Sequence, residues 1–167
     1  DNMAKRALSV LIWAAGLFLT VAVFLAMFIA AFILFPFDKK RAAAHRQCYW
    51  WADMLTGLNP SWKVRAGGLE HIDKKEAYVI VANHQSLADI ILLYKTKMQF
   101  KWVAKEDLFR VPLIGWCLAL AKHISLRRGD FSSIRKIYRE SAGWLRNGVS
   151  VVFFPEGPKC FPDGTER

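Results

Sequence analysis

The sequence feature that most limits what this chain can fold into is a run of apolar residues near its beginning. Residues 7–35 form 29 consecutive positions with no charged residue and no proline. As a helix this run would be ~43 Å long at ~1.5 Å per residue, which exceeds the ~30 Å of a bilayer's hydrocarbon core. It is also longer than the ~7–15-residue apolar core of a signal peptide, and residues 36–38 form no small-residue cleavage site. The run predicts membrane residence, either across the bilayer or within one leaflet.

Basic residues dominate the charge of the chain. The 167 residues carry 24 Lys and Arg against 14 Asp and Glu, a formal net charge of +10. Such an excess indicates a polyanionic partner: nucleic acid, an anionic membrane surface or a phosphorylated substrate. The basic residues are dispersed and no recognition motif for nucleic acid is present, so we expect no nucleic-acid partner. The basic cluster at residues 39–46 directly follows the apolar run and favours membrane phospholipids as partners and a cytoplasmic location for this side.

The cysteines argue against a metal or disulfide scaffold. Cys48, Cys117 and Cys160 are widely spaced, odd in number and contain no CxxC pair. This pattern predicts neither a disulfide framework nor a zinc site, and it fits a reducing compartment. We expect no bound metal ion.

Beyond the apolar run, short apolar stretches alternate with helical patterns. Residues 39–58 predict a second helix, whose Trp50 and Trp51 suit either a membrane interface or ordinary packing. Strands are expected at 77–82, 100–103, 123–126 and 149–154, and helices at 86–94, 112–122 and 130–147. We expect an α/β fold in which a mainly parallel or mixed sheet is flanked by helices. The predicted division is a membrane-anchoring helical segment over 1–58 and an α/β domain over 59–167.

The last helix, 130–147, has a strong amphipathic pattern. Its apolar residues predict an inward face, and its basic residues an outward one. The residues assigned to the inward face are Ile134, Ile137, Tyr138 and Leu145.

A polar cluster follows each of the four predicted strands. In an open α/β sheet, ligands bind beyond the carboxyl ends of the strands, so these four clusters are expected to converge on one rim. They are Asn83-His84, Lys105-Glu106, Arg127-Arg128 and Pro155-Glu156-Gly157. Two of the clusters have ordinary alternatives: Arg127-Arg128 as a solvated arginine pair, and Glu156 and Gly157 as a loop carboxylate and a turn glycine.

His84 and Asp89 are the sharpest pair in the sequence. On a regular helix, five positions at ~100° each would place them ~140° apart, so they could not share a face. They can meet only if His84 precedes the helix and Asp89 lies in its first turn. Ser86 and Asp89 fit a capping box with Ser86 as the N-cap. Asp89 is therefore either a helix cap or the partner that fixes the tautomer of a catalytic His84.

The ordered set of motifs resembles a known family. The chain is similar to the glycerolipid acyltransferases, and most of all to the lysophosphatidic acid acyltransferases (1-acyl-sn-glycerol-3-phosphate acyltransferases). Order and spacing agree over residues 62–157. The matching residues are Asn83-His84-x4-Asp89 (the NHx4D block), Lys105-Glu106 with Pro112 and Gly115, Ile124-x-x-Arg127, and Phe154-Pro155-Glu156-Gly157 (the FPEG block).

The resemblance implies a direct acyl transfer without a cofactor. His84, oriented by Asp89, would deprotonate the free sn-2 hydroxyl of a lysophospholipid acceptor, which attacks an acyl thioester of coenzyme A or acyl carrier protein. Arg127 and Lys105 would hold the acceptor's phosphate. Glu156, Gly157 and Lys159 would shape its site. The expected location is the inner membrane, with the catalytic domain on the cytoplasmic face.

Two departures from the family pattern bear on the acceptor. The FPEG block is usually followed by Thr-Arg-Ser, whereas Pro158-Lys159-Cys160 follows here; Lys159 keeps a charge but lacks the planar fork of arginine. Family members also usually continue through a further strand, so the α/β domain is expected to be incomplete at its C-terminus. The alternatives are an acyltransferase with another lyso-lipid or glycerol 3-phosphate as acceptor, or a catalytically incompetent membrane-binding member.

Overall fold

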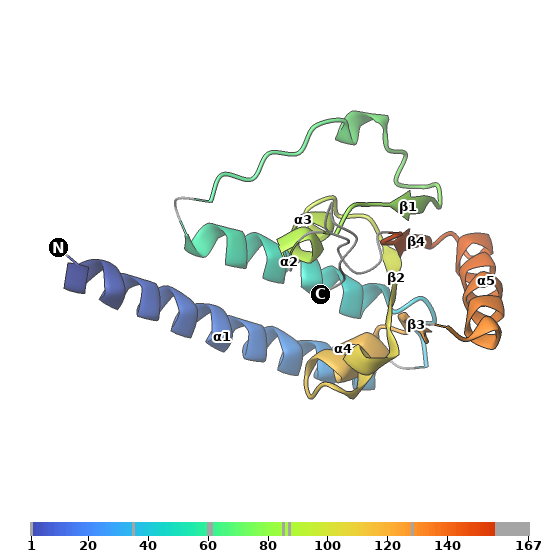
Figure 1. The fold of residues 1–167 in the computed structure, drawn as a ribbon, viewed down its shortest axis with the longest axis horizontal. Coiled ribbons are helices and arrows are strands. Elements are labelled where there is room, and N and C mark those ends of the chain that lie inside the picture. Colours follow the sequence, from blue (N-terminus) through green and yellow to red (C-terminus); the bar gives the residue numbers. More distant parts are fainter. Residues whose placement is uncertain are drawn as a thin grey trace, which may run out of the picture.

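The structure is a computed structural model that describes residues 2–34, 36–59, 62–84, 86, 88–127 and 129–155. Two long helices precede a small sheet whose strands alternate with shorter helices (Figure 1). The helices are α1 (Asn2–Ile33), α2 (Ala42–Leu58), α3 (Ala88–Tyr94), α4 (Ile114–Leu120) and α5 (Phe131–Arg146), with 3₁₀ turns η1 (Leu69–His71) and η2 (Glu106–Arg110). The strands are β1 (Val79–Val81), β2 (Phe100–Lys105), β3 (Ile124–Leu126) and β4 (Ser150–Phe153).

The four strands form one parallel sheet in the order β1-β4-β2-β3. Each described strand lies inside or within two residues of a predicted one. The central strand β4 is largely buried, whereas Val79 and Val81 of the edge strand β1 are exposed on one face. The α/β class with a parallel sheet flanked by helices is therefore confirmed. The helix predicted at 39–58 begins three residues later, since the Asp38 carboxylate accepts hydrogen bonds from the backbone N–H groups of Ala42 and Ala43 and caps it there.

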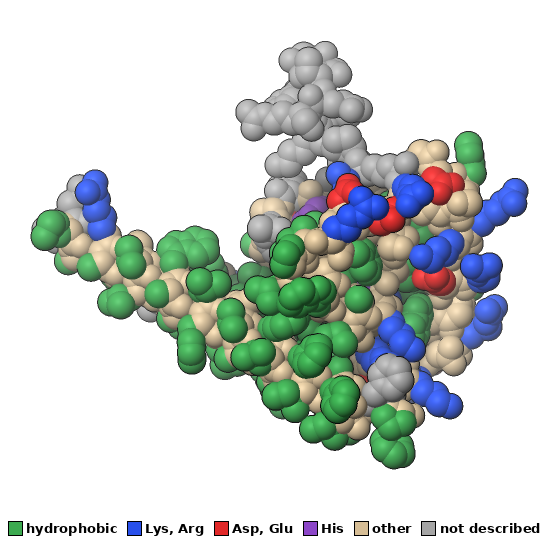
Figure 2. Space-filling model, turned by 90° about the horizontal axis from the view of Figure 1, so that it is seen from below, with side chains coloured by type: hydrophobic (Ala, Val, Ile, Leu, Met, Phe, Trp, Pro, Cys, Tyr) green, Lys and Arg blue, Asp and Glu red, His purple; other side chains and the backbone are tan. Residues whose placement is uncertain are grey.

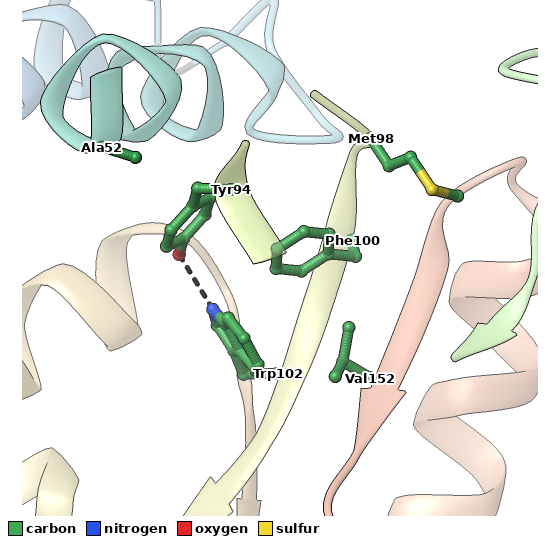
Figure 3. Close-up of a cluster of buried hydrophobic side chains, with 6 residues drawn as sticks. All are labelled: Ala52, Tyr94, Met98, Phe100, Trp102 and Val152. Atoms are coloured by element: carbon green, nitrogen blue, oxygen red, sulfur yellow. Dashed lines mark hydrogen bonds between the residues drawn. The ribbon is translucent and has the colours of Figure 1, made fainter. Parts of the chain in front are cut away.

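One face of the sheet packs against α2 and α3, and this layer holds the largest buried cluster (Figure 3). Phe100 and Trp102 alternate on this face of β2, as the two-residue period of a strand requires. The Trp102 indole N–H donates to the Tyr94 hydroxyl at 2.8 Å, which satisfies the polar atom of a buried tryptophan. The cluster consists of Ala52, Tyr94, Met98, Phe100, Trp102 and Val152. The predicted domain boundary after residue 58 stays a prediction, but α2 on its N-terminal side contributes Ala52 to this core.

On the other face α5 packs against β3 and β4, and two of the four residues expected to face inward from it do not. Ile137 is buried against the sheet and Leu145 is partly buried, but Ile134 and Tyr138 are exposed. The inward stripe of α5 contains Ser133, Ile137 and Ser141, four residues apart. The small serines let the helix approach the sheet closely, and the hydroxyl of Ser133 accepts a hydrogen bond from a backbone N–H just after β3. A pattern that counts serine as polar thus finds Ile137 and Leu145 but assigns Ile134 and Tyr138 inward in place of Ser133 and Ser141.

The helix α1 is long and apolar enough to cross a membrane, judged by length and composition. It runs antiparallel to α2: Gly16 lies against Leu55, and the Trp51 indole N–H donates to the Thr20 hydroxyl at 3.0 Å. Trp51 is therefore partly buried in this pair, whereas Trp50 is exposed. Hydrophobic side chains cover the outer side of α1 and continue onto the adjoining part of the domain (Figure 2).

His45, Lys101 and His123 are buried near the amino-terminal ends of the strands. The Nδ1 of His123 accepts a hydrogen bond from the backbone N–H of Trp102 at 2.9 Å, and burial lowers its pKa. Burial also lowers the pKa of His45 to about 3. Lys101 donates to the carbonyl of Lys40 at 2.9 Å and to that of Ala121 at 2.6 Å, and its pKa is lowered by burial to about 7. His45 and His123 are both buried in the core.

Candidate active site

His84 and Asp89 meet at the carboxyl end of β1. The chain leaves this strand at Val81, and His84 precedes α3, whose first turn contains Asp89. The Nδ1 of His84 lies 3.2 Å from Oδ2 of Asp89, within hydrogen-bond reach. About a third of the His84 side chain (36%) and a quarter of that of Asp89 (26%) is exposed, so the pair opens to solvent. The geometry that the spacing required, with the histidine in the loop and the aspartate in the helix, is present.

Asp89 makes the contacts of both roles that the sequence left open. Its Oδ2 also accepts a hydrogen bond from the backbone N–H of Ser86 at 2.8 Å, while the Ser86 hydroxyl accepts one from the backbone N–H of Ala88 at 3.1 Å. This reciprocal pattern is a capping box. The same carboxylate oxygen thus closes the start of α3 and faces the imidazole. Because the cap fixes the position of Asp89, the histidine meets a partner whose orientation is already set.

The ring of His84 rests on an aromatic stack that the sequence analysis missed. It lies on Phe154 with centroids 4.3 Å apart and an interplanar angle of 23°, and Phe154 stacks in turn on Trp102 at 5.3 Å and 21°. Phe154 directly follows β4 and Trp102 lies on β2. The stack holds one face of the imidazole ring, and the Asp89 carboxylate holds its Nδ1 edge. The alternation of side chains along β2 and β4 is the signal that could have revealed it.

The predicted phosphate-binding residues gather at the other side of the same rim. Lys105 ends β2 opposite Leu126 of β3, and Arg127 follows that residue. The Arg127 guanidinium is engaged by Glu106: Nε donates to Oε2 at 2.6 Å, and a terminal nitrogen donates to Oε1 at 3.0 Å. This bidentate hydrogen bonding lowers the pKa of Glu106 and raises that of Arg127. Sequence analysis placed Glu106 in the block without assigning it this contact.

The structure brings together part of the predicted rim. With ~4.8 Å between neighbouring strands, the three steps from β1 to β3 separate the chain at His84 from that at Arg127 by ~14 Å, a span that long basic side chains can shorten. Lys105 lies between them along the rim. Glu156, Gly157 and Lys159, predicted to shape the acceptor site, lie outside the described residues, as does Arg128.

A histidine–carboxylate pair with one ring nitrogen still available is the arrangement of a general base. Cationic side chains on the same rim suit an anionic group of the substrate. The chemistry that such a rim can perform is proton abstraction from a hydroxyl of a phosphorylated molecule.

Comparison with known proteins places the chain in a family. The model of the Acyltransferase family matches residues 63–165, and the chain belongs to that family. It is 33% identical over 153 residues to a 1-acyl-sn-glycerol-3-phosphate acyltransferase of Chlamydomonas reinhardtii, covering 90% of this chain and 46% of that protein. It is 31% identical over 115 residues to the enzyme of the same name from Pseudomonas aeruginosa, covering 68% of this chain and 43% of that protein.

A solved structure is also similar. The crystal structure of the 1-acyl-sn-glycerophosphate acyltransferase PlsC from Thermotoga maritima matches with a TM-score of 0.58 and 27% identity, over 93% of this chain and 66% of that one. The resemblance to the lysophosphatidic acid acyltransferases is therefore confirmed at the level of family and fold. The chain spans about half the length of the curated relatives described above.

Proposed function

We propose that this chain carries the acyl-transfer site of a lysophosphatidate acyltransferase. The enzyme transfers a fatty acyl group from a thioester to the free sn-2 hydroxyl of lysophosphatidate and forms phosphatidate in phospholipid biosynthesis. The observation that carries the proposal is the hydrogen bond between His84 and Asp89 at the carboxyl rim of the sheet. The names of the relatives support the acceptor class.

The proposed reaction is a direct attack with His84 as general base. Asp89 holds the proton on Nδ1, so that Nε2 can accept the proton of the acceptor hydroxyl. The hydroxyl oxygen then attacks the thioester carbonyl carbon and gives a tetrahedral oxyanion. When this intermediate collapses, the carbon–sulfur bond breaks and the thiolate takes the proton from the imidazolium. The product is an ester and a free thiol, and His84 returns to its neutral form.

Binding of the acceptor's phosphate is assigned to Lys105 and Arg127. A guanidinium forms two parallel hydrogen bonds with phosphate as readily as with carboxylate. Glu106 occupies that fork in the structure, so the phosphate exchanges with the carboxylate of Glu106 or shares the guanidinium with it. Glu156, Gly157 and Lys159 complete the acceptor site in this proposal.

The acyl donor is acyl-CoA or acyl carrier protein, and the reaction requires no cofactor or metal. Long-chain lysophosphatidate resides in membranes, which agrees with the apolar length of α1. The proposed location is the inner membrane with the site on the cytoplasmic side, where soluble thioester donors are present.

The test supplies radiolabelled lysophosphatidate with acyl-CoA, or with acyl carrier protein loaded with a fatty acid, to membranes containing the full protein. His84→Ala should abolish the labelled phosphatidate, and His71→Ala, at an exposed histidine outside the rim, should leave it unchanged. Equal background turnover in wild type and His84→Ala would identify a catalytically incompetent member. Turnover of another lyso-lipid or of glycerol 3-phosphate in its place would correct the acceptor.

A further inference from the structure

The segment between β2 and β3 presents an apolar surface that the acyl-transfer chemistry does not use. Residues 111–121 contain no charged side chain. Single exposed apolar residues are ordinary, but a contiguous group of large ones marks an interaction surface. Trp116 is 57% exposed and Ile114 is 52% exposed. The exposed apolar residues of η2, α4 and the turn between them are Leu108, Val111, Leu113, Ile114 and Trp116, here called the η2–α4 surface.

The backbone at this surface is held in a strained, tightly packed turn. Leu113 has φ 66° and ψ −59°, and the backbone N–H of Ile114 donates to the carbonyl of Pro112 at 2.8 Å. These are the features of a γ-turn with positive φ, a rare and strained conformation that a bulky residue seldom adopts. Gly115 lies so close to Phe109 that an added Cβ would clash with the Phe109 carbonyl oxygen. Backbone strain of this kind concentrates at functional contacts. Here it holds the large apolar side chains of Leu113 and Ile114 in exposed positions.

The η2–α4 surface is continuous with the apolar side of α1. The rings of Trp116 and Phe24 have centroids 6.1 Å apart. Val21 and Phe28 lie one turn before and one turn after Phe24 on the same side of α1, and both are exposed. Figure 2 shows the result from below: hydrophobic side chains run along α1 and over the adjoining part of the domain, while Lys and Arg gather toward the opposite border.

The packing of α1 limits how it can contact a bilayer. From Gly16 to its end at Ile33 the helix lies beside α2 and α4, a length of ~27 Å at ~1.5 Å per residue. A bilayer that covers the exposed side of this part of α1 must also meet the segment packed next to it. Its contact with this side of α1 therefore favours lipid as the occupant of the η2–α4 surface.

We propose that the η2–α4 surface is a second membrane-contacting element, which lies with the exposed side of α1 in the interfacial layer of one leaflet. Trp116 is a side-chain type enriched at that depth. Arg110, 70% exposed and 3.9 Å from Asp107, lies at the edge, where it can meet anionic headgroups. The η2 turn begins directly after Lys105, so the η2–α4 surface borders the candidate active site. This inference concerns where the domain meets lipid, and it does not depend on the acyl-transfer proposal.

The test measures depth at labelled positions in the full chain, whose cysteines are first replaced by alanine. An environment-sensitive fluorophore is attached at Ile114→Cys or, as a second position, Val111→Cys. The matched control is Tyr138→Cys on α5, where the side chain is 74% exposed and faces away from the proposed surface. Each protein is bound to vesicles of phosphatidylethanolamine and phosphatidylglycerol that contain nitroxide-bearing lipid. Aqueous iodide is the second quencher.

We expect lipid-borne nitroxide to quench the labels at 111 and 114 by at least twofold more than the label at 138, and iodide to show the reverse order. Iodide quenching at 111 and 114 equal to that at 138 would overturn the proposal. So would shielding from iodide without nitroxide quenching, since that result would indicate a protein partner or a second copy. Nitroxide quenching at all three positions would also overturn it, because the contact would then not be confined to this surface.

Discussion

Replacement of Asp89 by asparagine separates the effects of the two contacts that one carboxylate oxygen makes. In the structure Oδ2 accepts from the backbone N–H of Ser86 at 2.8 Å and faces Nδ1 of His84 at 3.2 Å. An asparagine keeps a carbonyl oxygen for the cap, but it is neutral and cannot stabilise a protonated imidazole. Asp89→Asn should therefore leave the fold of α3 in place and lower the rate of proton abstraction.

The size of the loss follows from the distance between the two groups. Coulomb's law at 3.2 Å gives ~1.3 kcal/mol in bulk water and ~5 kcal/mol at an effective dielectric constant of ~20. The side chains of His84 and Asp89 are 36% and 26% exposed, so an intermediate value of ~2–4 kcal/mol applies. At ~1.4 kcal/mol per factor of ten, kcat should fall by roughly 30- to 1,000-fold. The expected loss of stability is only ~1 kcal/mol, as for other changes at a helix cap.

Ser86→Ala is the matched control for this prediction. It removes the hydroxyl that accepts from the backbone N–H of Ala88 at 3.1 Å, but it keeps the Ser86 backbone N–H and the Asp89 carboxylate. It should cost a similar ~1 kcal/mol of stability and reduce kcat by less than about threefold. Acyl transfer to lysophosphatidate and thermal unfolding, both measured in the same detergent, compare the two variants. Equal losses of kcat in Asp89→Asn and Ser86→Ala would show that Asp89 acts only as a cap and would refute the reasoning.

Three further predictions concern the core, the turn and the rim. Burial lowers the pKa of Lys101 to about 7 from an ordinary 10.5, so the unfolded chain binds more protons between these values. The free energy of unfolding of the wild type, relative to that of Lys101→Met, should thus rise between pH ~7 and ~10.5 by up to ~1.4 kcal/mol per pH unit. Denaturant unfolding measures this difference. Gly115→Ala forces a Cβ into the carbonyl oxygen of Phe109 and should cost about 3 kcal/mol in thermal unfolding, whereas Gly143→Ala, with nothing within 4 Å, should be neutral or stabilising. Glu106→Gln should free the Arg127 fork and lower the KM for lysophosphatidate by up to about fivefold, with no change for an uncharged monoacylglycerol; an unchanged KM for both acceptors would contradict the assignment of phosphate binding to Arg127.

The strands and helices and their order along the chain follow from the sequence because the relevant signals are local. Short apolar runs identify the strands, and the polar residues after them identify the rim. The capping box explains how His84 and Asp89 can meet despite a spacing that no regular helix permits. These inferences use residues no more than five positions apart, and the structure agrees with their geometry.

Contacts that depend on packing between distant segments were not predictable in the same way. Apolar content alone assigned Ile134 and Tyr138 to the inward side of α5, but the small residues Ser133 and Ser141 occupy it because they allow a close approach to the sheet. The pairing of Arg127 with Glu106 depends on the adjacency of β2 and β3 and on the rotamers of two long side chains. No local pattern states which of several neighbouring charges will meet.

The aromatic support of His84 lies between these two cases. Side chains two positions apart lie on the same face of a strand, so Trp102 on β2 and Phe154 after β4 were predictable members of one face. The same parity, continued from Ile80 on β1, reaches His84. What parity cannot supply is the strand order, which sets β4 between β1 and β2 and so inserts Phe154 between the imidazole and the indole. The orientation of the candidate base thus depends on the strand order as well as on its own motif. Substitutions at Phe154 should therefore disturb catalysis although His84 and Asp89 themselves are retained.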